Sequence, residues 1–338
     1  MELKLRMRWA LAFFEAVGKL TTLLPASVSH AFGRVCGRAA WLACPRERRI
    51  GIAQATYVAQ KRPTLTRERT PEEIVRASFA HLGQSVAELF TFHKLLTLEP
   101  GSENLPTGPF FKHIRATGSE LCAHYRTEKR PILALSGHLG NFELLAAYHA
   151  KFGMRVTVIG REPNYSGLSV FIDRLRANYQ AESLWRHGRV VASGVLRALK
   201  TGRSLAVLID QDTALASAYA PFFDLHAASP RAPIDLAIRQ RLPIITSFIV
   251  REGKDRHHVL SEDVPYDASD PQAAEKVLAI FNRRLEDLIL SHPEQWIWWH
   301  RRWRRRPNVD YEREPQKLLT RDQYIEWIVR QAEGEARL

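Results

Sequence analysis

The 338-residue sequence has no stretch of about 18 uncharged apolar residues, the length that a membrane-crossing helix requires. Its first thirty residues also lack the long apolar core and the small-residue cleavage site of a secretory signal. We therefore expect a chain that neither crosses a membrane nor enters the secretory route.

Cysteine is scarce, because only Cys36, Cys44 and Cys122 occur. They are widely spaced, and no pair has the separation of a zinc-binding or redox motif. This pattern excludes a disulfide framework and indicates a protein of a reducing compartment.

Acidic residues are in deficit, with 36 Asp and Glu against 49 Lys and Arg, so the net charge is +13 and the sequence pI is near 9.9. A surplus of this size favours anionic partners such as nucleic acid, phosphorylated small molecules or an anionic membrane face. Hydrophobic residues make up 45% and charged residues 25%, which is ordinary for a folded protein and excludes global disorder.

The amino-terminal segment has the periodicity of an amphipathic helix over residues 6–24, ended by Pro25. Such a helix either lies in a membrane interface, with Trp9 at headgroup level, or packs on the rest of the protein, and both interpretations stay open. The pattern predicts further helices over residues 27–43, 50–59 and 71–98.

After about residue 110, apolar β-type runs alternate with helical stretches, which predicts a sheet covered by helices. The strands are expected at 132–135, 156–159, 205–209, 244–250 and 258–261. The helices are expected near 142–152, 166–179, 189–200, 231–240 and 271–291. We divide the chain into a helical, membrane-associating region over 1–65, an α/β domain over 66–310, and a tail with a helix over 311–338.

The segment "SGHLGNFE", residues 136–143, follows a buried strand and begins a helix. Two glycines permit a sharp turn, and Asn141 is a good helix cap. This leaves His138 exposed before the helix, with Glu143 in the first helical turn. We expect Glu143 to hold one ring nitrogen of His138 and make the other a general base, although a polar helix cap is an equally valid interpretation of the spacing alone.

Two further motifs also follow predicted strands. Arg161 in "VIGRE" suits a two-pronged grip on a phosphate or carboxylate, or is an ordinary loop arginine. Asp210 and Asp212 in "LIDQD" form an Asp-x-Asp pair, which binds a divalent metal in glycosyl transfer or simply positions a basic partner or a loop.

The segment "EQWIWWHRRWRRRP", residues 294–307, combines four of the eight tryptophans with five arginines. Three interpretations stay open. Such a segment can bind nucleic acid by stacking and phosphate contacts, or it can rest on an anionic bilayer. Alternatively Trp296, Ile297 and Trp299 are core and only the arginines are solvated.

These motifs occur in an order that resembles the late lipid A biosynthesis acyltransferases of the lysophospholipid acyltransferase superfamily, over roughly residues 5–310. The resemblance is carried by "HLGNFE" at 138–143, "GRE" at 160–162, "DQD" at 210–212, "PFF" at 221–223, "HPEQWIWWHRRWRRRP" at 292–307 and "LGQSVAELF" at 82–90, which includes Glu88.

The resemblance implies a glycerolipid-acyltransferase-like α/β fold with a central mixed, largely parallel sheet, located peripherally on the cytoplasmic face of the inner membrane. It implies transfer of a fatty acyl group from an acyl carrier protein thioester to a hydroxyl of a lipid A precursor, without metal or organic cofactor and without a nucleic-acid partner. It assigns His138 as the base and Glu143 as its partner. Substrate binding is assigned to Asn141, Arg161, Asp210 and Asp212, and contact with the anionic membrane to Trp9, Arg301, Arg302, Trp303 and Arg304.

Two departures from the family pattern keep the acceptor open. "DLHAASPRAP" follows "PFF" where the family usually has a Thr- and Gly-containing turn, and Glu162 stands where proline is frequent. If these loops shape the acceptor pocket, another glycolipid such as a phosphatidylinositol mannoside, or a lysophospholipid, is the alternative acceptor. The alternative from another class is a basic nucleic-acid-binding protein.

Overall fold

The computed structural model describes residues 23–97, 109–163, 166–186, 190–213 and 216–334. The predicted amino-terminal helix and Trp9 lie outside these residues. Within them the helices are α2 (Ala26–Ala43), α3 (Pro45–Lys61), α4 (Pro71–Thr97), α5 (Ser119–Thr127), α6 (Phe142–Lys151), α7 (Ser166–Ala177), α8 (Val190–Lys200), α9 (Ala232–Arg239), α10 (Ala273–Ser291) and α11 (Arg321–Glu333). Short 3₁₀ turns lie at Pro63–Thr66, Pro109–His113, Pro293–Gln295 and Pro315–Lys317.

A seven-stranded sheet forms the centre of the protein, with the strand order β1-β9-β8-β2-β5-β3-β4. Its strands are β1 (Ile114–Thr117), β2 (Leu133–Ser136), β3 (Val156–Gly160), β4 (Glu182–Trp185), β5 (Ser204–Leu208), β8 (Ile244–Arg251) and β9 (His257–Asp263). The five strands from β8 to β4 are parallel, and β9 pairs antiparallel with β8. The prediction of a mixed, largely parallel sheet is confirmed.

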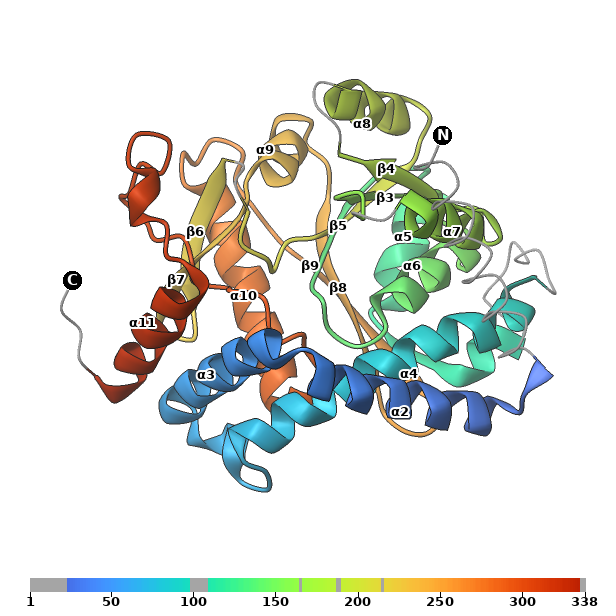
Figure 1. Cartoon of the computed structure of the whole chain (residues 1–338). Coiled ribbons are helices and arrows are strands. Elements are labelled where there is room, and N and C mark those ends of the chain that lie inside the picture. Colours follow the sequence, from blue (N-terminus) through green and yellow to red (C-terminus); the bar gives the residue numbers. More distant parts are fainter. Residues whose placement is uncertain (1–22, 98–108, 164–165, 187–189, 214–215, 335–338) are drawn as a thin grey trace, which may run out of the picture.

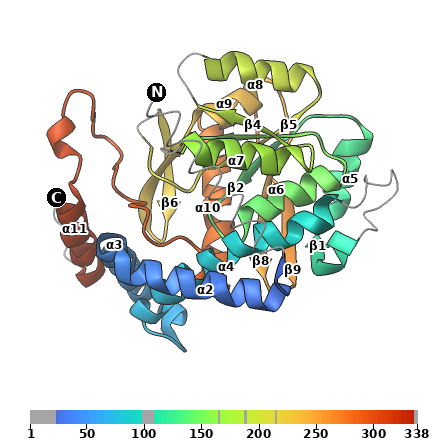
Figure 2. The same cartoon turned by 45° about the vertical axis from the view of Figure 1, so that its right-hand side comes forward.

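Helices cover both faces of the sheet, because its central strands are apolar on both sides. One face carries α5, α6 and α7, and the other carries α9, α10 and the antiparallel hairpin of β6 (Ser217–Phe222) and β7 (Leu225–Pro230), as Figure 1 shows. Figure 2, turned by 45°, brings α6 and α7 to the front of the sheet. Two hydrophobic cores result, one on each face.

The helices α2 and α4 pack closely against each other beneath the sheet in both views (Figures 1 and 2). The close approach depends on glycine. A Cβ atom at Gly33 would meet the backbone carbonyl of Gly83, and one at Gly37 would meet that of Phe79. At the carboxyl terminus, α11 packs on α3, where the Tyr324 hydroxyl donates to Gln54 Oε1 at 2.7 Å.

Within the described residues no helix is both long enough and apolar enough to cross a membrane. The predicted domain boundaries at residues 65 and 310 stay predictions.

Candidate active site

The turn that carries His138 connects β2 to α6 at the carboxyl edge of the parallel strands, where ligands bind in open α/β sheets. Gly140 has a φ of +62°, and a Cβ atom there would meet the carbonyl of Ile249, so the turn requires glycine. The segment around Trp296 fixes the turn from outside, because the Gln295 carbonyl accepts from Gly140 N–H at 2.9 Å and Ile297 N–H donates to the His138 carbonyl at 3.2 Å. The position of His138 is therefore set by backbone contacts.

Asn141 caps α6, as predicted. Its Oδ1 accepts from Leu144 N–H at 3.3 Å, and its Nδ2 donates to the Ser85 carbonyl at 3.1 Å and to Glu88 Oε2 at 3.0 Å. The side chain of Asn141 is buried and holds the turn against α4, and its predicted role in substrate binding stays a prediction.

His138 is bound by Asp210, which follows the neighbouring strand β5. The ring Nδ1 lies 2.7 Å from Asp210 Oδ1, and His138 main-chain N–H donates to Oδ2 at 2.7 Å. Trp296 Nε1 donates to the same Oδ2 at 2.9 Å. One carboxylate thus holds both the imidazole and the backbone of His138.

Asp210 is 1% exposed, and burial alone would raise its pKa. The charge of His138 and the hydrogen bonds from His138 and Trp296 outweigh burial and lower the pKa far below the usual value, so the carboxylate is ionised at neutral pH. Facing an anion, Nδ1 carries the proton of the neutral imidazole and Nε2 carries the lone pair. The His138 side chain is 18% exposed, so Nε2 is a base within reach of a substrate.

The predicted contact between Glu143 and His138 is wrong. Glu143 instead forms a two-pronged ion pair with Arg176 of α7, with Oε1 2.6 Å from Nη2 and Oε2 3.1 Å from Nε. The Arg176 side chain is 6% exposed and needs a counter-charge. The first turn of α6 directs Glu143 toward α7, while Asp210 takes the place beside the imidazole.

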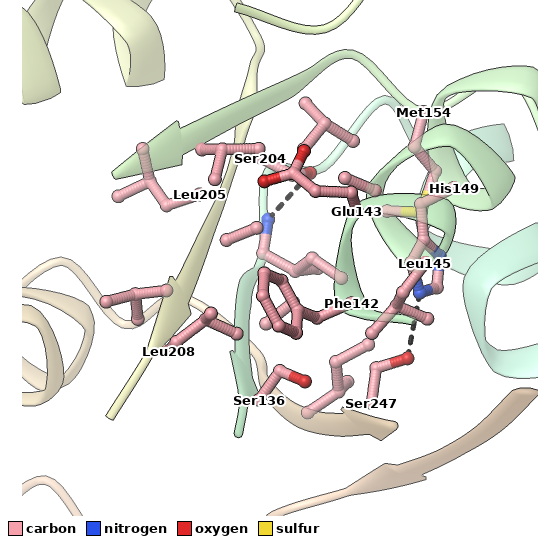
Figure 3. Close-up of a pocket in the computed structure, with 18 of the residues that line it drawn as sticks. Ser136, Phe142, Glu143, Leu145, His149, Met154, Ser204, Leu205, Leu208 and Ser247 are labelled. Carbon is pink, nitrogen blue, oxygen red and sulfur yellow. Dashed lines mark hydrogen bonds between the residues drawn. The ribbon is translucent and has the colours of Figure 1, made fainter. Parts of the chain in front are cut away.

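An apolar cavity lies between α6 and the strands β2, β3, β5 and β8 (Figure 3). It has a volume of about 60 Å³, room for a few water molecules. Phe142, whose ring also contacts His138 at a centroid distance of 5.2 Å, projects into it. Glu143 and Arg176 contribute charged groups to its lining. Elsewhere in the lining, His149 Nε2 and Ser247 Oγ form a hydrogen bond of 2.8 Å. The cavity is therefore adjacent to the base.

Two residues near His138 were not predicted from the sequence as site residues. Gln211 Nε2 lies 2.8 Å from His138 Nε2 and 2.6 Å from His300 Nε2. Burial and the charge of His138 lower the pKa of His300 to about 4, so this imidazole is neutral at neutral pH. Both residues lie within motifs of the sequence, "DQD" and "WWHRRW", and the position of Gln211 shortly after β5 could have indicated its place at the site.

Arg161 lies directly after β3, exposed at the same edge of the sheet, and has no ion pair among the described residues. Its predicted role in substrate binding stays a prediction. Asp212 is instead bound to Arg305, with Oδ2 2.7 Å from Nη1.

The Asp-x-Asp pair does not have the arrangement of a metal site. Both Asp210 oxygens accept hydrogen bonds from protein N–H groups, and Asp212 faces an arginine. In the part of the chain that the structure describes, no three His, Cys, Asp or Glu side chains are grouped to hold a metal ion. The geometry favours a His–Asp pair over the metal-dependent alternative.

Six of the fourteen residues of the Trp/Arg segment are buried, and the other eight are only partly exposed. Arg302 and Trp303 are fully buried, so their predicted contact with the membrane is wrong. Arg302 Nη2 donates to Ser229 Oγ at 3.0 Å, and Trp303 Nε1 donates to the Phe222 carbonyl at 3.0 Å. Arg304 is partly buried and its Nε donates to the Leu319 carbonyl at 3.1 Å. Tertiary packing of the β6–β7 hairpin buries side chains whose composition suggested a surface.

The sequence over residues 2–305 matches the model of the family described as bacterial lipid A biosynthesis acyltransferase. The chain belongs to this family. It is 29% identical over 196 residues to the lipid A biosynthesis lauroyltransferase of Escherichia coli K12, a match that covers 56% of this chain and 61% of that enzyme. It is 31% identical over 125 residues to the lipid A biosynthesis palmitoleoyltransferase of the same organism, covering 36% of this chain and 40% of that protein. The chain thus aligns with less than two thirds of these relatives' length.

Proposed function

We propose that this lipid A biosynthesis acyltransferase family member transfers a fatty acyl group from the thioester of an acyl carrier protein to a hydroxyl of a lipid A precursor. The observation that carries the proposal is the hydrogen bond between His138 Nδ1 and the buried Asp210 carboxylate. It leaves His138 Nε2 as a base at the carboxyl edge of the sheet, beside an apolar cavity.

In this mechanism His138 Nε2 removes the proton of the acceptor hydroxyl while its oxygen attacks the thioester carbonyl carbon. The new carbon–oxygen bond forms, the carbon–sulfur bond breaks, and the imidazolium returns the proton to the departing thiolate. Asp210 keeps the ring in the required tautomer and stabilises the positive charge of the imidazolium. The chemistry balances with these groups alone.

The cavity between α6 and the sheet is suited to the apolar acyl chain of the donor, because the cavity is lined mainly by aliphatic side chains. At about 60 Å³ the cavity is too small for a fatty acyl chain as it stands. Phe142 must therefore move when the chain enters, and this movement would also shift the contact between Phe142 and His138.

A lipid A precursor is favoured as the acceptor because the chain belongs to the lipid A biosynthesis acyltransferase family, and the two departures from the family pattern give no reason to prefer another acceptor. The departure after "PFF" forms β7, whose Ala227, Ala228 and Ser229 are fully buried, and Ser229 Oγ donates to the Ile209 carbonyl at 2.7 Å. Glu162 accepts from Ser169 Oγ at 3.0 Å. Both segments are bonded within the protein, and neither departure argues for a different glycolipid.

We place the protein peripherally on the inner membrane through the outer face of α2. That face carries an exposed apolar stripe, which we call the α2 stripe: Val28, Phe32, Val35 and Leu42, with Leu24 just before the helix. Phe32 is 53% and Leu42 is 74% exposed. A surface helix of a water-soluble protein normally has polar residues on its outer face, and α2 has the reverse pattern, with its small residues packed against α4.

The occupant that fits the α2 stripe is an anionic bilayer. The exposed Arg38 lies on α2 beside the stripe, and the exposed Arg46 follows just beyond the end of α2, where both can meet acidic lipid headgroups. The stripe is connected to the site through α4, since α2 packs on α4 and α4 binds Asn141 of the catalytic turn. Docking there would bring the base to the surface on which a lipid acceptor lies.

The proposal is tested by incubating the purified protein with acyl carrier protein thioesters and a lipid A precursor and following the acceptor by mass spectrometry. We expect the mass of one acyl group to be added by the wild type and not by His138→Ala. Tight binding of polynucleotide without any acyl transfer would favour the nucleic-acid-binding alternative.

A further inference from the structure

Gln211 lies between two imidazole rings at the candidate site. Its amide nitrogen is 2.8 Å from His138 Nε2 and 2.6 Å from His300 Nε2, and it is also 3.0 Å from His138 Nδ1. Because it is almost equally far from both ring nitrogens, it lies over the face of the His138 imidazole and away from the in-plane direction of the Nε2 lone pair. The centroids of the two rings are 5.3 Å apart.

The hydrogen-bond roles in this group follow from Asp210. Because the Nδ1–H of His138 donates to Asp210, the Nε2 of this ring carries the lone pair, and Gln211 leaves its in-plane direction open. One amide hydrogen of Gln211 is directed to His300 Nε2, which accepts because the ring is neutral. This bond fixes the Gln211 amide beside the base before any substrate binds, with a second N–H to donate.

We propose that Gln211 is a catalytic hydrogen-bond donor that stabilises the negative oxygen formed when the thioester is attacked, and that His300 positions it. This inference rests on the proposed acyl transfer. A reacting hydroxyl donates along the open lone pair of His138 Nε2. The second N–H of Gln211, on the amide nitrogen 2.8 Å from the same ring nitrogen, is then available to the carbonyl oxygen of the attacked thioester.

Electrostatic reasons support a donor at this place. The carbonyl oxygen gains a full negative charge in the tetrahedral intermediate and loses it when the carbon–sulfur bond breaks. A donor fixed in advance stabilises this charge without reorganisation, and an amide stays neutral throughout, so it does not compete for the proton that moves between the hydroxyl, His138 and the thiolate.

The first test replaces Gln211 by methionine, which has a similar shape and no hydrogen-bond donor. We expect kcat for acyl transfer to fall about 100-fold while the KM values for thioester and acceptor stay within about threefold. Gln211→Glu is the companion variant, because it keeps an oxygen and loses both N–H groups. It should lose at least as much kcat, since a carboxylate repels the negative oxygen.

The second test is a double-mutant cycle with His300→Leu. If His300 acts through Gln211, His300→Leu lowers kcat in the wild type and has no further effect in Gln211→Met. The backbone carbonyl of His300 accepts from Gln54 Nε2 at 2.6 Å and is unaffected by this change. Thermal unfolding of each variant shows whether it folds as the wild type does.

Several results would overturn the inference while leaving the proposed function intact. These are a Gln211→Met enzyme with kcat within threefold of an active wild type, an increase in its rate, a change confined to the KM of the acceptor, or additive effects of the two substitutions. A wild type that transfers no acyl group would overturn the proposed function itself.

Discussion

Asp210 binds His138 at two points, with one carboxylate oxygen 2.7 Å from the ring Nδ1 and the other 2.7 Å from the main-chain nitrogen. The two residues are 72 positions apart in sequence and follow the paired strands β2 and β5, in which Ser136 lies opposite Leu208. The carboxylate that orients the base is thus supplied by the neighbouring strand.

Replacing Asp210 by Asn should lower kcat by about 10³- to 10⁴-fold, because an amide neither selects the required tautomer of His138 nor stabilises its positive form. Steady-state kinetics of acyl transfer measure this. Asp212→Asn is the matched control, since Asp212 is bound to Arg305 and not to His138. Equal losses in the two variants would contradict the assignment.

Replacing Glu143 by Gln should chiefly affect stability. The change leaves the buried Arg176 guanidinium without its carboxylate, which costs about 3 kcal/mol of unfolding free energy. Urea denaturation measures this cost, and the loss in Glu143→Gln/Arg176→Met should be smaller than the sum of the single losses. Wild-type stability combined with a loss of kcat as large as that of Asp210→Asn would instead return Glu143 to the role of partner of His138.

Removing the α2 stripe should weaken membrane binding. We expect Val28→Ser/Phe32→Ser/Val35→Ser to bind vesicles containing anionic lipid more than tenfold less tightly, as followed by vesicle sedimentation. The control is Leu196→Ser, which changes another exposed apolar residue, on α8 at the opposite end of the molecule from α2 (Figures 1 and 2). Binding should also fall with salt, because the arginines contribute through charge. Equal binding of both variants would show that α2 does not face the bilayer.

The protein should lose stability as the pH falls from about 6.5 to 4. Burial lowers the pKa of His149 to about 4 from its ordinary value of 6.5. Since the unfolded chain takes up the proton at a higher pH than the native state, stability is complete above pH 6.5 and declines below it by about 1.4 kcal/mol per pH unit for this group. Urea denaturation at several pH values should give a slope smaller by about one proton in His149→Gln. An unchanged slope would mean that His149 titrates normally.

Much of the fold follows from local sequence patterns. The helical period predicted residues 27–43 and 71–98, and the structure has α2 at Ala26–Ala43 and α4 at Pro71–Thr97. Strands that are buried on both faces, such as β5 and β8, were predicted by their apolar runs. β1, α5, β4 and the β6–β7 hairpin were missed. β1 and β4 are short edge strands that each include a charged residue, and the hairpin is rich in alanine and serine.

The site was only partly predictable. The strand–turn–helix pattern located His138 and the cap Asn141. Glu143 was predicted as the partner of His138 because the two residues are close in sequence. The actual partner is Asp210, and its position depends on which strands are neighbours in the sheet. The general rule that neighbouring parallel strands bring their carboxyl ends together would have favoured Asp210. The burial of Arg302 follows from contacts with Ser229 and Asn282, which lie far from it in sequence.

The most direct test of the central claim is single-turnover acyl transfer to a lipid A precursor by the wild type, His138→Ala and Asp210→Asn, with the acylated product quantified by mass spectrometry. The mechanism predicts product with the wild type, none above background with His138→Ala, and a rate lower by about three orders of magnitude or more with Asp210→Asn. Product formation at the wild-type rate by His138→Ala would contradict it.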